Sequence, residues 1–235
     1  MNWDDLPVLF PEFDSPARWL PLLEQHHALL LASAEHTRVT SVGAEDAVRR
    51  HYAESLEIWR TASTAAPGPA LATDIGSGGG FPGLVAACVS PGVRFALVEP
   101  LKKRARLLEQ AAETLGLANV EVHALRAEEA GRGPLRDTAG IVVARAVASL
   151  PELLEYTAPF ARTGGVIVLP KGSGLPEELE ASLAAQRVLR CEYLGATPMR
   201  PEVSETLSVA LFRKTGATNA RYPRRPGMPH QRPLT

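Results

Sequence analysis

The chain has 235 residues, 45% of them hydrophobic and 22% charged, and a formal net charge of −1. This composition is typical of a globular protein with one sizeable core, and it excludes a wholly disordered chain or one built from membrane spans. The acidic start, Met1 to Asp5, is not followed by a signal-type apolar segment, which predicts a cytoplasmic location. The two cysteines lie far apart and outside any C-x-x-C pair, which argues against a zinc site or a disulfide scaffold.

Residues 1–66 are expected to form a helical extension. Ser15-Pro16 is a typical helix start, with serine as the cap and proline in the first turn. A second helix is predicted from Ala44 to Arg60, because its apolar residues recur at helical spacing. A break that contains proline and glycine, from Thr64 to Pro69, ends the extension.

Residues 67–214 alternate short apolar runs with amphipathic segments, the pattern of a parallel sheet covered by helices. The last two strands are joined by a loop with Pro198 and Pro201 rather than by a helix, so they are predicted to be antiparallel neighbours. The expected α/β fold is therefore Rossmann-like, with a seven-stranded, mostly parallel sheet. Strands are predicted at 70–75, 93–98, 119–124, 140–144, 165–170, about 190–196 and 206–212, and helices near 82–90, 101–115, 150–161 and 176–188.

Residues 215–235 form a basic, proline-rich tail. From Arg213 to the end there are six basic residues and no acid, and removing them from the net charge of −1 leaves −7 for residues 1–212. This asymmetry predicts that the tail contacts a polyanion. The tail is too polar to build its own core, which predicts either an extended segment or a strap across the body.

A glycine turn follows the first predicted strand and precedes an apolar helix. It reads Asp74-Ile-Gly-Ser-Gly-Gly-Gly-Phe-Pro-Gly83. Gly78, Gly80 and Gly83 satisfy G-x-G-x-x-G, the dinucleotide fingerprint of nicotinamide-dependent oxidoreductases. Starting from Asp74, the pattern acid-x-G-x-G-x-G resembles the first motif of class I S-adenosylmethionine-dependent methyltransferases. The turn alone leaves both cofactors open.

Other polar residues follow the predicted strands at their carboxyl ends. Glu99, after the second strand, can accept hydrogen bonds from both hydroxyls of a ribose. Glu128, after the third, is placed to accept the amino group of an adenine, and Arg145, after the fourth, lies beside the cleft where such sheets bind ligands. Lys171 ends the fifth strand. The competing interpretation makes each of them an exposed polar residue at the end of an element.

Several motifs, from about residue 38 to the C-terminus, resemble those of the ribosomal RNA small subunit methyltransferase G family, also called GidB. The motifs are Arg50-His-Tyr-Ala-Glu-Ser-Leu56, Asp74 to Gly83, Arg126-Ala-Glu-Glu129, Arg145-Ala-Val-Ala-Ser-Leu150, Leu169-Pro-Lys-Gly172 and Tyr222-Pro-Arg-Arg-Pro-Gly-Met-Pro229. The chain departs from the family pattern with Arg38-Val39-Thr40 for N-L-T, Glu54 for aspartate and Ala144 for serine.

The resemblance implies a monomeric enzyme that transfers a methyl group from S-adenosylmethionine to N7 of a guanine in 16S ribosomal RNA. The expected donor contacts are Asp74, Gly76, Gly78, Phe81, Glu99, Ala127, Glu128 and Arg145, and the expected contacts to RNA phosphates are Lys171, Arg221, Arg224 and Arg225. His51 or Tyr52 is expected to frame the base. Neither a general base nor a metal is expected, since the histidines show no metal-binding spacing and N7 carries a lone pair at neutral pH. The remaining alternatives are a methyltransferase with a protein or small-molecule acceptor, an oxidoreductase, and an RNA-binding protein without a donor site.

Overall fold

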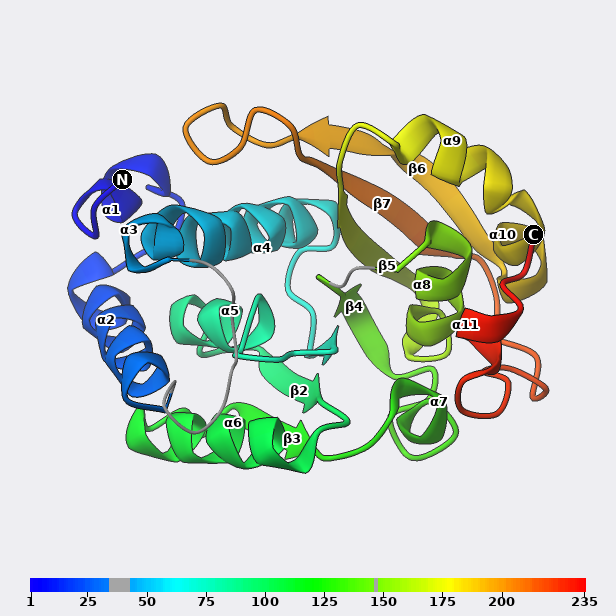
Figure 1. Ribbon diagram of the computed structural model, residues 1–235, viewed down its shortest axis with the longest axis horizontal. Helices are drawn as coiled ribbons and strands as arrows, with labels where there is room; N and C mark the ends of the chain where they lie inside the picture. The colour runs from blue at the N-terminus through cyan, green and yellow to red at the C-terminus, as the bar shows by residue number, and fades with distance from the viewer. Residues whose placement is uncertain (34–42, 146–147) are drawn as a thin grey trace.

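One β-sheet organises the computed structural model, which describes residues 1–33, 43–145 and 148–235 (Figure 1). Within these ranges seven strands form a sheet in the order β3-β2-β1-β4-β5-β7-β6. Neighbours among β1 to β5 are parallel, whereas β7 is antiparallel to both β5 and β6. The predicted seven-stranded sheet with an antiparallel end is confirmed. The strands are β1 (Leu71–Ile75), β2 (Arg94–Val98), β3 (Val120–His123), β4 (Ala139–Val143), β5 (Ala161–Lys171), β6 (Cys191–Pro198) and β7 (Ser208–Lys214).

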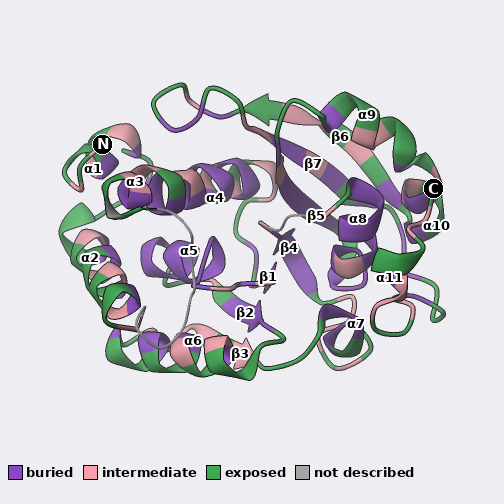
Figure 2. Ribbon diagram, in the orientation of Figure 1, coloured by how far each residue is buried: buried purple, intermediate pink, exposed green. Residues whose placement is uncertain are grey.

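Helices pack on both faces of the sheet, and its central strands are buried, whereas the edge strands β3 and β6 are partly exposed (Figure 2). Side chains alternate between two hydrophobic clusters: Ile141 and Val143 belong to one, and Val142 to the other. Because both faces of central strands such as β2 and β4 are buried, these strands are near-continuous apolar runs, which made them recognisable. The covering helices are α5 (Gly83–Val89) and α6 (Lys102–Thr114) on the first face, and α8 (Leu150–Thr157), α9 (Leu175–Ala181) and α10 (Leu183–Leu189) on the second.

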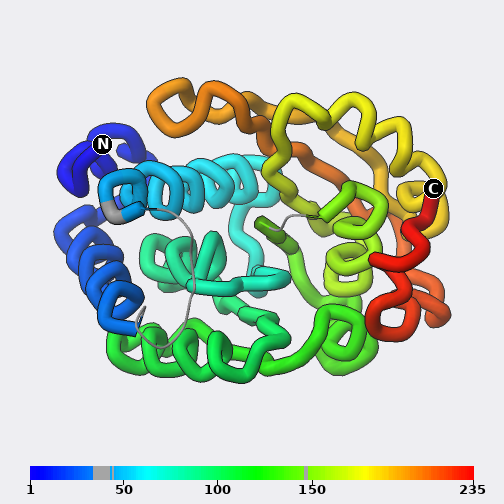
Figure 3. Tube along the Cα trace, in the orientation of Figure 1, coloured from blue at the N-terminus to red at the C-terminus, as the bar shows by residue number. Residues whose placement is uncertain are grey.

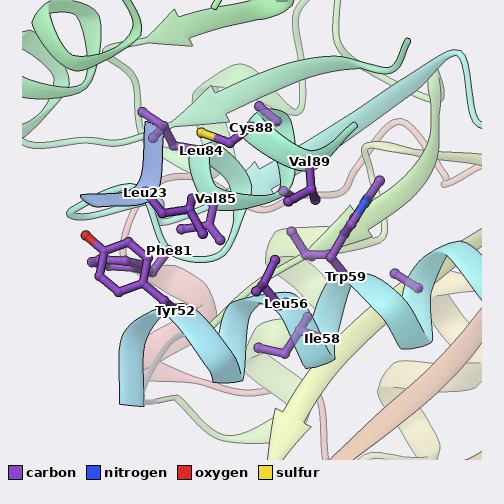
Figure 4. Packing of buried hydrophobic residues seen from close by; sticks show 14 of the residues in the cluster. Leu23, Tyr52, Leu56, Ile58, Trp59, Phe81, Leu84, Val85, Cys88 and Val89 are labelled. Atoms are coloured by element: carbon purple, nitrogen blue, oxygen red, sulfur yellow. The ribbon is translucent and has the colours of Figure 1, made fainter. Parts of the chain in front are cut away.

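The N-terminal helices share the core of the first face. Figure 3 traces them along two sides of α5, and the ring of Trp59 packs 5.0 Å from that of Phe95 on β2, centroid to centroid. Figure 4 shows side chains of α4 packed toward Val85 and Val89 of α5. The extension is therefore part of the body that carries the glycine turn. Its elements are α1 (Asp5–Leu9), α2 (Pro16–Ser33), α3 (Ala44–Ala47), the π-helix η1 (Val48–Ala53) and α4 (Glu54–Ala65).

The elements differ from the prediction in three places. The helix expected at 176–188 is two helices that meet at Ser182. The buried hydroxyl of Ser182 donates to the carbonyl of Leu179, and such a local bond competes with the hydrogen bonds of a regular helix. The helix expected from Ala44 contains the π-helical turn η1. Two short helices, α7 (Ala127–Ala130) and α11 (Met228–Gln231), were not predicted. The segment Arg38-Val39-Thr40 and residues 146–147 of the Arg145 motif lie outside the described residues.

In the parts of the chain that the structure describes, no helix has both the length and the apolar character needed to cross a bilayer. Across the same residues, no group of three or more His, Cys, Asp and Glu side chains is arranged to hold a metal ion.

Candidate functional site

The loops that carry the predicted ligand residues all leave one edge of the sheet. The glycine turn follows β1, Glu99 follows β2, α7 follows β3 and Arg145 follows β4. The strand order reverses between β1 and β4, and sheets of this kind bind ligands in the crevice at that point. The structure thus brings together the loops that the sequence indicated, and the ligand role of each residue stays a prediction.

The backbone of the glycine turn takes conformations that glycine favours. Gly76, Gly78 and Gly80 have φ angles of 76°, 55° and 97°. At Gly83 the constraint is space, because a Cβ atom there would lie 2.6 Å from Oδ2 of Asp74 and from the Leu97 side chain. The turn and the start of α5 are therefore held tightly against β1 and β2.

Asp74 lies beneath this turn and is fully buried. Its Oδ2 accepts a hydrogen bond of 2.9 Å from the backbone N–H of Gly83. Its Oδ1 is buried without a hydrogen-bond partner among the described residues. Burial raises the pKa of Asp74 to about 6, although the Gly83 hydrogen bond works in the opposite direction. A buried carboxylate with one oxygen unsatisfied is suited to accept a hydrogen bond from a cationic group of a ligand.

Glu99 joins the end of β2 to the glycine turn. Its Oε2 accepts the N–H of Gly78 and its Oε1 the N–H of Leu101, each at 2.9 Å. The side chain is buried, and the two hydrogen bonds fix the plane of the carboxylate. Each oxygen retains a lone pair, which is the arrangement needed to accept the two hydroxyls of a ribose.

Phe81 connects the glycine turn to the π-helix η1. Its ring stacks on His51 with centroids 4.5 Å apart. Tyr52, which lies beside Phe81 in Figure 4, meets the ring edge-on with centroids 5.4 Å apart. The guanidinium of Arg145 lies 5.2 Å from the ring centroid. Single π-helical turns are frequent at functional sites, and here one presents two aromatic residues to the turn. Tyr52 is fully buried, and its role toward the base stays a prediction.

His26 is a supporting residue that the sequence analysis did not assign. Its Nε2 lies 2.9 Å from the carbonyl of Gly79, and its Nδ1 lies 3.2 Å from the hydroxyl of Tyr52. A carbonyl only accepts, so Nε2 carries the proton and Nδ1 accepts from Tyr52. Burial lowers the pKa of His26 to about 4, which keeps the ring neutral in this arrangement. His26 shares the buried face of α2 with Trp19, Leu23 and Leu30, and a histidine in such an apolar stripe was the available signal.

Arg145 bridges the end of β4 and the N-terminal extension. It donates to the carbonyl of Arg50 at 2.7 Å and to Glu54 at 3.3 Å, and its other terminal nitrogen lies 3.3 Å from Nδ1 of His51. Burial, followed by the charge of Arg145, lowers the pKa of His51 to about 4, so that Nδ1 is an acceptor. Arg145 therefore fixes His51, which in turn stacks on Phe81.

Ala127 and Glu128 begin α7, beside the end of β3. Ala127 belongs to the same hydrophobic cluster as Ile75 and Val98, which end β1 and β2. Glu128 is buried, and its Oε1 accepts a hydrogen bond of 2.9 Å from the N–H of Gly227 in the tail. The adenine-binding residues expected from the resemblance thus lie where the tail meets the body.

The four residues expected to hold RNA phosphates divide into two pairs. Lys171 is buried and bonds to Glu178 at 2.7 Å and to the carbonyl of Ala148 at 2.8 Å. Arg224 is bound to the buried Glu155. Arg221 and Arg225 are exposed. The RNA role of all four stays a prediction, and the structure gives the first pair acidic partners within the chain.

The topology of the sheet and its glycine turn define a class I methyltransferase. Dinucleotide-binding domains have the strand order 3-2-1-4-5-6, whereas here β7 is inserted antiparallel between β5 and β6. A solved structure of an S-adenosylmethionine-dependent methyltransferase from Aquifex aeolicus has the same fold, with a TM-score of 0.54 and 14% identity over 74% of this chain and 94% of that chain. The structure of cofactor-bound Rv0187 from MTB has a TM-score of 0.53 and 23% sequence identity, over 83% of this chain and 90% of that chain.

Within this class, the chain belongs to the rRNA small subunit methyltransferase G family. The GidB family model matches residues 20–199. The ribosomal RNA small subunit methyltransferase G of Carboxydothermus hydrogenoformans is 37% identical over 220 residues, 92% of each chain. That of Chloroflexus aggregans is 38% identical over 188 residues, 80% of this chain and 78% of that one. The family membership that the motifs predicted is confirmed.

Proposed function

We propose that this protein transfers the methyl group of S-adenosylmethionine to N7 of a guanine in 16S ribosomal RNA. Family membership supports the reaction and its RNA substrate. The observation that carries the donor site is the buried Asp74, whose unsatisfied oxygen lies under a glycine turn that is itself bonded to Glu99. A cationic amino acid moiety and a ribose match these two carboxylates in charge and in hydrogen bonding.

The donor is assigned to the carboxyl edge of the sheet by its chemistry. Asp74 accepts the ammonium group, Glu99 the ribose hydroxyls and Glu128 the amino group of adenine. Arg145 fixes the position of Phe81, both directly and through His51, which stacks on the Phe81 ring. The complete set of proposed donor residues is Asp74, Gly76, Gly78, Phe81, Glu99, Ala127, Glu128 and Arg145.

Methyl transfer to N7 needs alignment rather than proton transfer. The in-plane lone pair of N7 attacks the methyl carbon, the carbon–sulfur bond breaks, and its electron pair stays on sulfur. The positive charge moves from sulfur to the purine ring, so no proton has to leave. Holding the reactants in line supplies about 7–11 kcal/mol in well-oriented systems. The rigid turn, fixed by Gly83 and His26, supports such alignment from the donor side.

We further propose that the protein acts as a cytoplasmic monomer, with a helical extension (1–66), a catalytic core (67–214) and a tail (215–235). The exposed Arg221 and Arg225 supply positive charge for RNA phosphates.

Mass spectrometry of nucleosides from 16S RNA tests the function. RNA from cells that lack this gene is expected to lose one 7-methylguanosine, and the purified protein with S-adenosylmethionine is expected to restore it. Unchanged 7-methylguanosine would overturn the assignment. Methyl transfer to a protein or small molecule alone, or reduction of a substrate with NADH, would establish one of the other enzyme classes instead.

Affinity for the donor is expected to fall in acid because Asp74 must lose its proton to bind an ammonium group. The pKa of Asp74 is raised to about 6 in the free protein, and a neighbouring ammonium lowers it. Binding of S-adenosylhomocysteine should therefore weaken about tenfold between about pH 7 and about pH 5, with release of close to one proton at about pH 5 and of little at about pH 7. Calorimetry in buffers of different ionisation enthalpy measures both. Asp74→Asn should bind weakly and without this pH dependence, and a flat profile for the wild-type protein would contradict the role of Asp74.

A further inference from the structure

We propose that the C-terminal tail, residues 215–235, positions the carboxylate of Glu128 for the adenine of the methyl donor. The sequence suggested an RNA-binding arm or a strap, and the contacts favour a strap that ends in the donor site. This inference rests on the proposed donor role of Glu128. It makes the tail part of the donor site, in addition to any contact with RNA.

The first anchor of the tail is a buried ion pair. Arg224 donates three side-chain hydrogen bonds of 2.6 to 3.0 Å to the carboxylate of Glu155, and its backbone N–H donates a fourth of 2.8 Å. Glu155 lies on α8 and is fully buried, so its charge depends on this partner. The arginine is thereby committed to the body of the protein rather than to a ligand.

The second anchor comes from the turn that follows α7. Arg136 donates to the carbonyls of Tyr222 and Thr218, at 2.8 and 2.7 Å, and Arg132 donates to that of Pro223. The Tyr222 ring is buried in the cluster that also contains Ala127 and Ala130 of α7. The tail is therefore bound both to α7, which carries Glu128, and to the turn that follows α7.

The contact with Glu128 comes directly after these anchors. Gly227, with a φ of 83°, points its N–H at Oε1 of Glu128 at 2.9 Å. A carboxylate has two oxygens and about four lone-pair positions, so this bond restrains its orientation and leaves capacity for the amino group of adenine. An acceptor that is fixed in advance loses less freedom when the ligand binds, which favours affinity and selectivity.

The test is selectivity for the 6-amino group. Calorimetry gives the affinity for S-adenosylhomocysteine and for S-inosylhomocysteine, which carries oxygen in place of that amino group. The preference of the wild-type protein for the adenine compound is expected to be about tenfold or more, and Glu128→Gln should abolish it. A double variant, Glu155→Gln with Arg224→Gln, removes the anchor without leaving a buried charge and is expected to lose most of the same preference. Arg232→Gln, an exposed change in the same tail, is the matched control and should retain it.

The outcomes separate the two claims. If Glu128→Gln keeps the preference, the proposed donor role of Glu128 is wrong. If Glu128→Gln loses it while removal of either anchor leaves it unchanged, Glu128 binds adenine but the tail does not position it, and the inference is overturned. Thermal unfolding of each variant shows that it is folded. A second variant, Arg132→Gln with Arg136→Gln, removes the other anchor of the tail and leaves the backbone of Gly227 unchanged. It should reproduce the loss, which keeps the inference testable if the first double variant fails to fold.

Discussion

Arg224→Ala is expected to lower the free energy of unfolding by about 3–5 kcal/mol, because it leaves a buried carboxylate without its partner. Glu155 is fully buried, and the side-chain hydrogen bonds that satisfy it come from Arg224. The same hydrogen bonds raise the pKa of Arg224, which keeps the arginine charged. Urea unfolding of the full chain measures the effect through the transition midpoint.

Two controls identify the buried charge as the cause. Arg232→Ala removes an exposed arginine from the same tail and should change the unfolding free energy by less than about 0.5 kcal/mol. Glu155→Gln combined with Arg224→Gln removes both charges, so its destabilisation should be clearly smaller than that of Arg224→Ala. Equal midpoints for wild type and Arg224→Ala would show that the tail does not bind the body in solution.

The sheet was predictable because its central strands are visible in the sequence as short apolar runs. Residues 139–143 of β4 are buried on both faces, and such a strand must be apolar throughout. The glycine turn was equally visible, since three of its positions need positive φ and Gly83 has no room for a Cβ atom. The break at Ser182 was not visible, because its hydroxyl gains the Leu179 carbonyl only in this packing.

The site was predictable as far as it depends on topology. Glu99, Glu128 and Arg145 follow strands whose carboxyl ends must meet at one edge, so their proximity follows from the strand order. The hydrogen-bond partner of each side chain does not follow from the strand order. His26 bonds to Gly79, 53 positions away, and Arg224 to Glu155, 69 positions away. The positive charge of the tail predicted a polyanion partner. A count of charges does not reveal that Glu155, in the body of the protein, is buried and is paired with Arg224 of the tail.

The stability of the protein is expected to fall in acid because of His26. The pKa of His26 falls from 6.5 in the unfolded chain to about 4 in the native protein. Between these values the unfolded state binds a proton that the native state does not, so stability is lost as the pH falls from about 6.5 to about 4. The expected contribution of this one group is on the order of 3 kcal/mol. Asp74, with a pKa raised to about 6, acts in the opposite direction, because the native state holds its proton more tightly than the unfolded state does.

A comparison of variants isolates the histidine. His26→Gln should be less stable than wild type at about pH 7.5, and this gap should shrink by about 3 kcal/mol at about pH 4, since Asp74 contributes equally to both proteins. Tyr52→Phe removes the hydroxyl that donates to His26 but leaves the ring buried, so it should cost about 1 kcal/mol and keep the pH dependence of wild type. Urea unfolding across this pH range measures all three proteins. A gap between wild type and His26→Gln that is independent of pH would mean that the pKa of His26 is the same in the native and unfolded states, and would contradict a ring held neutral by burial.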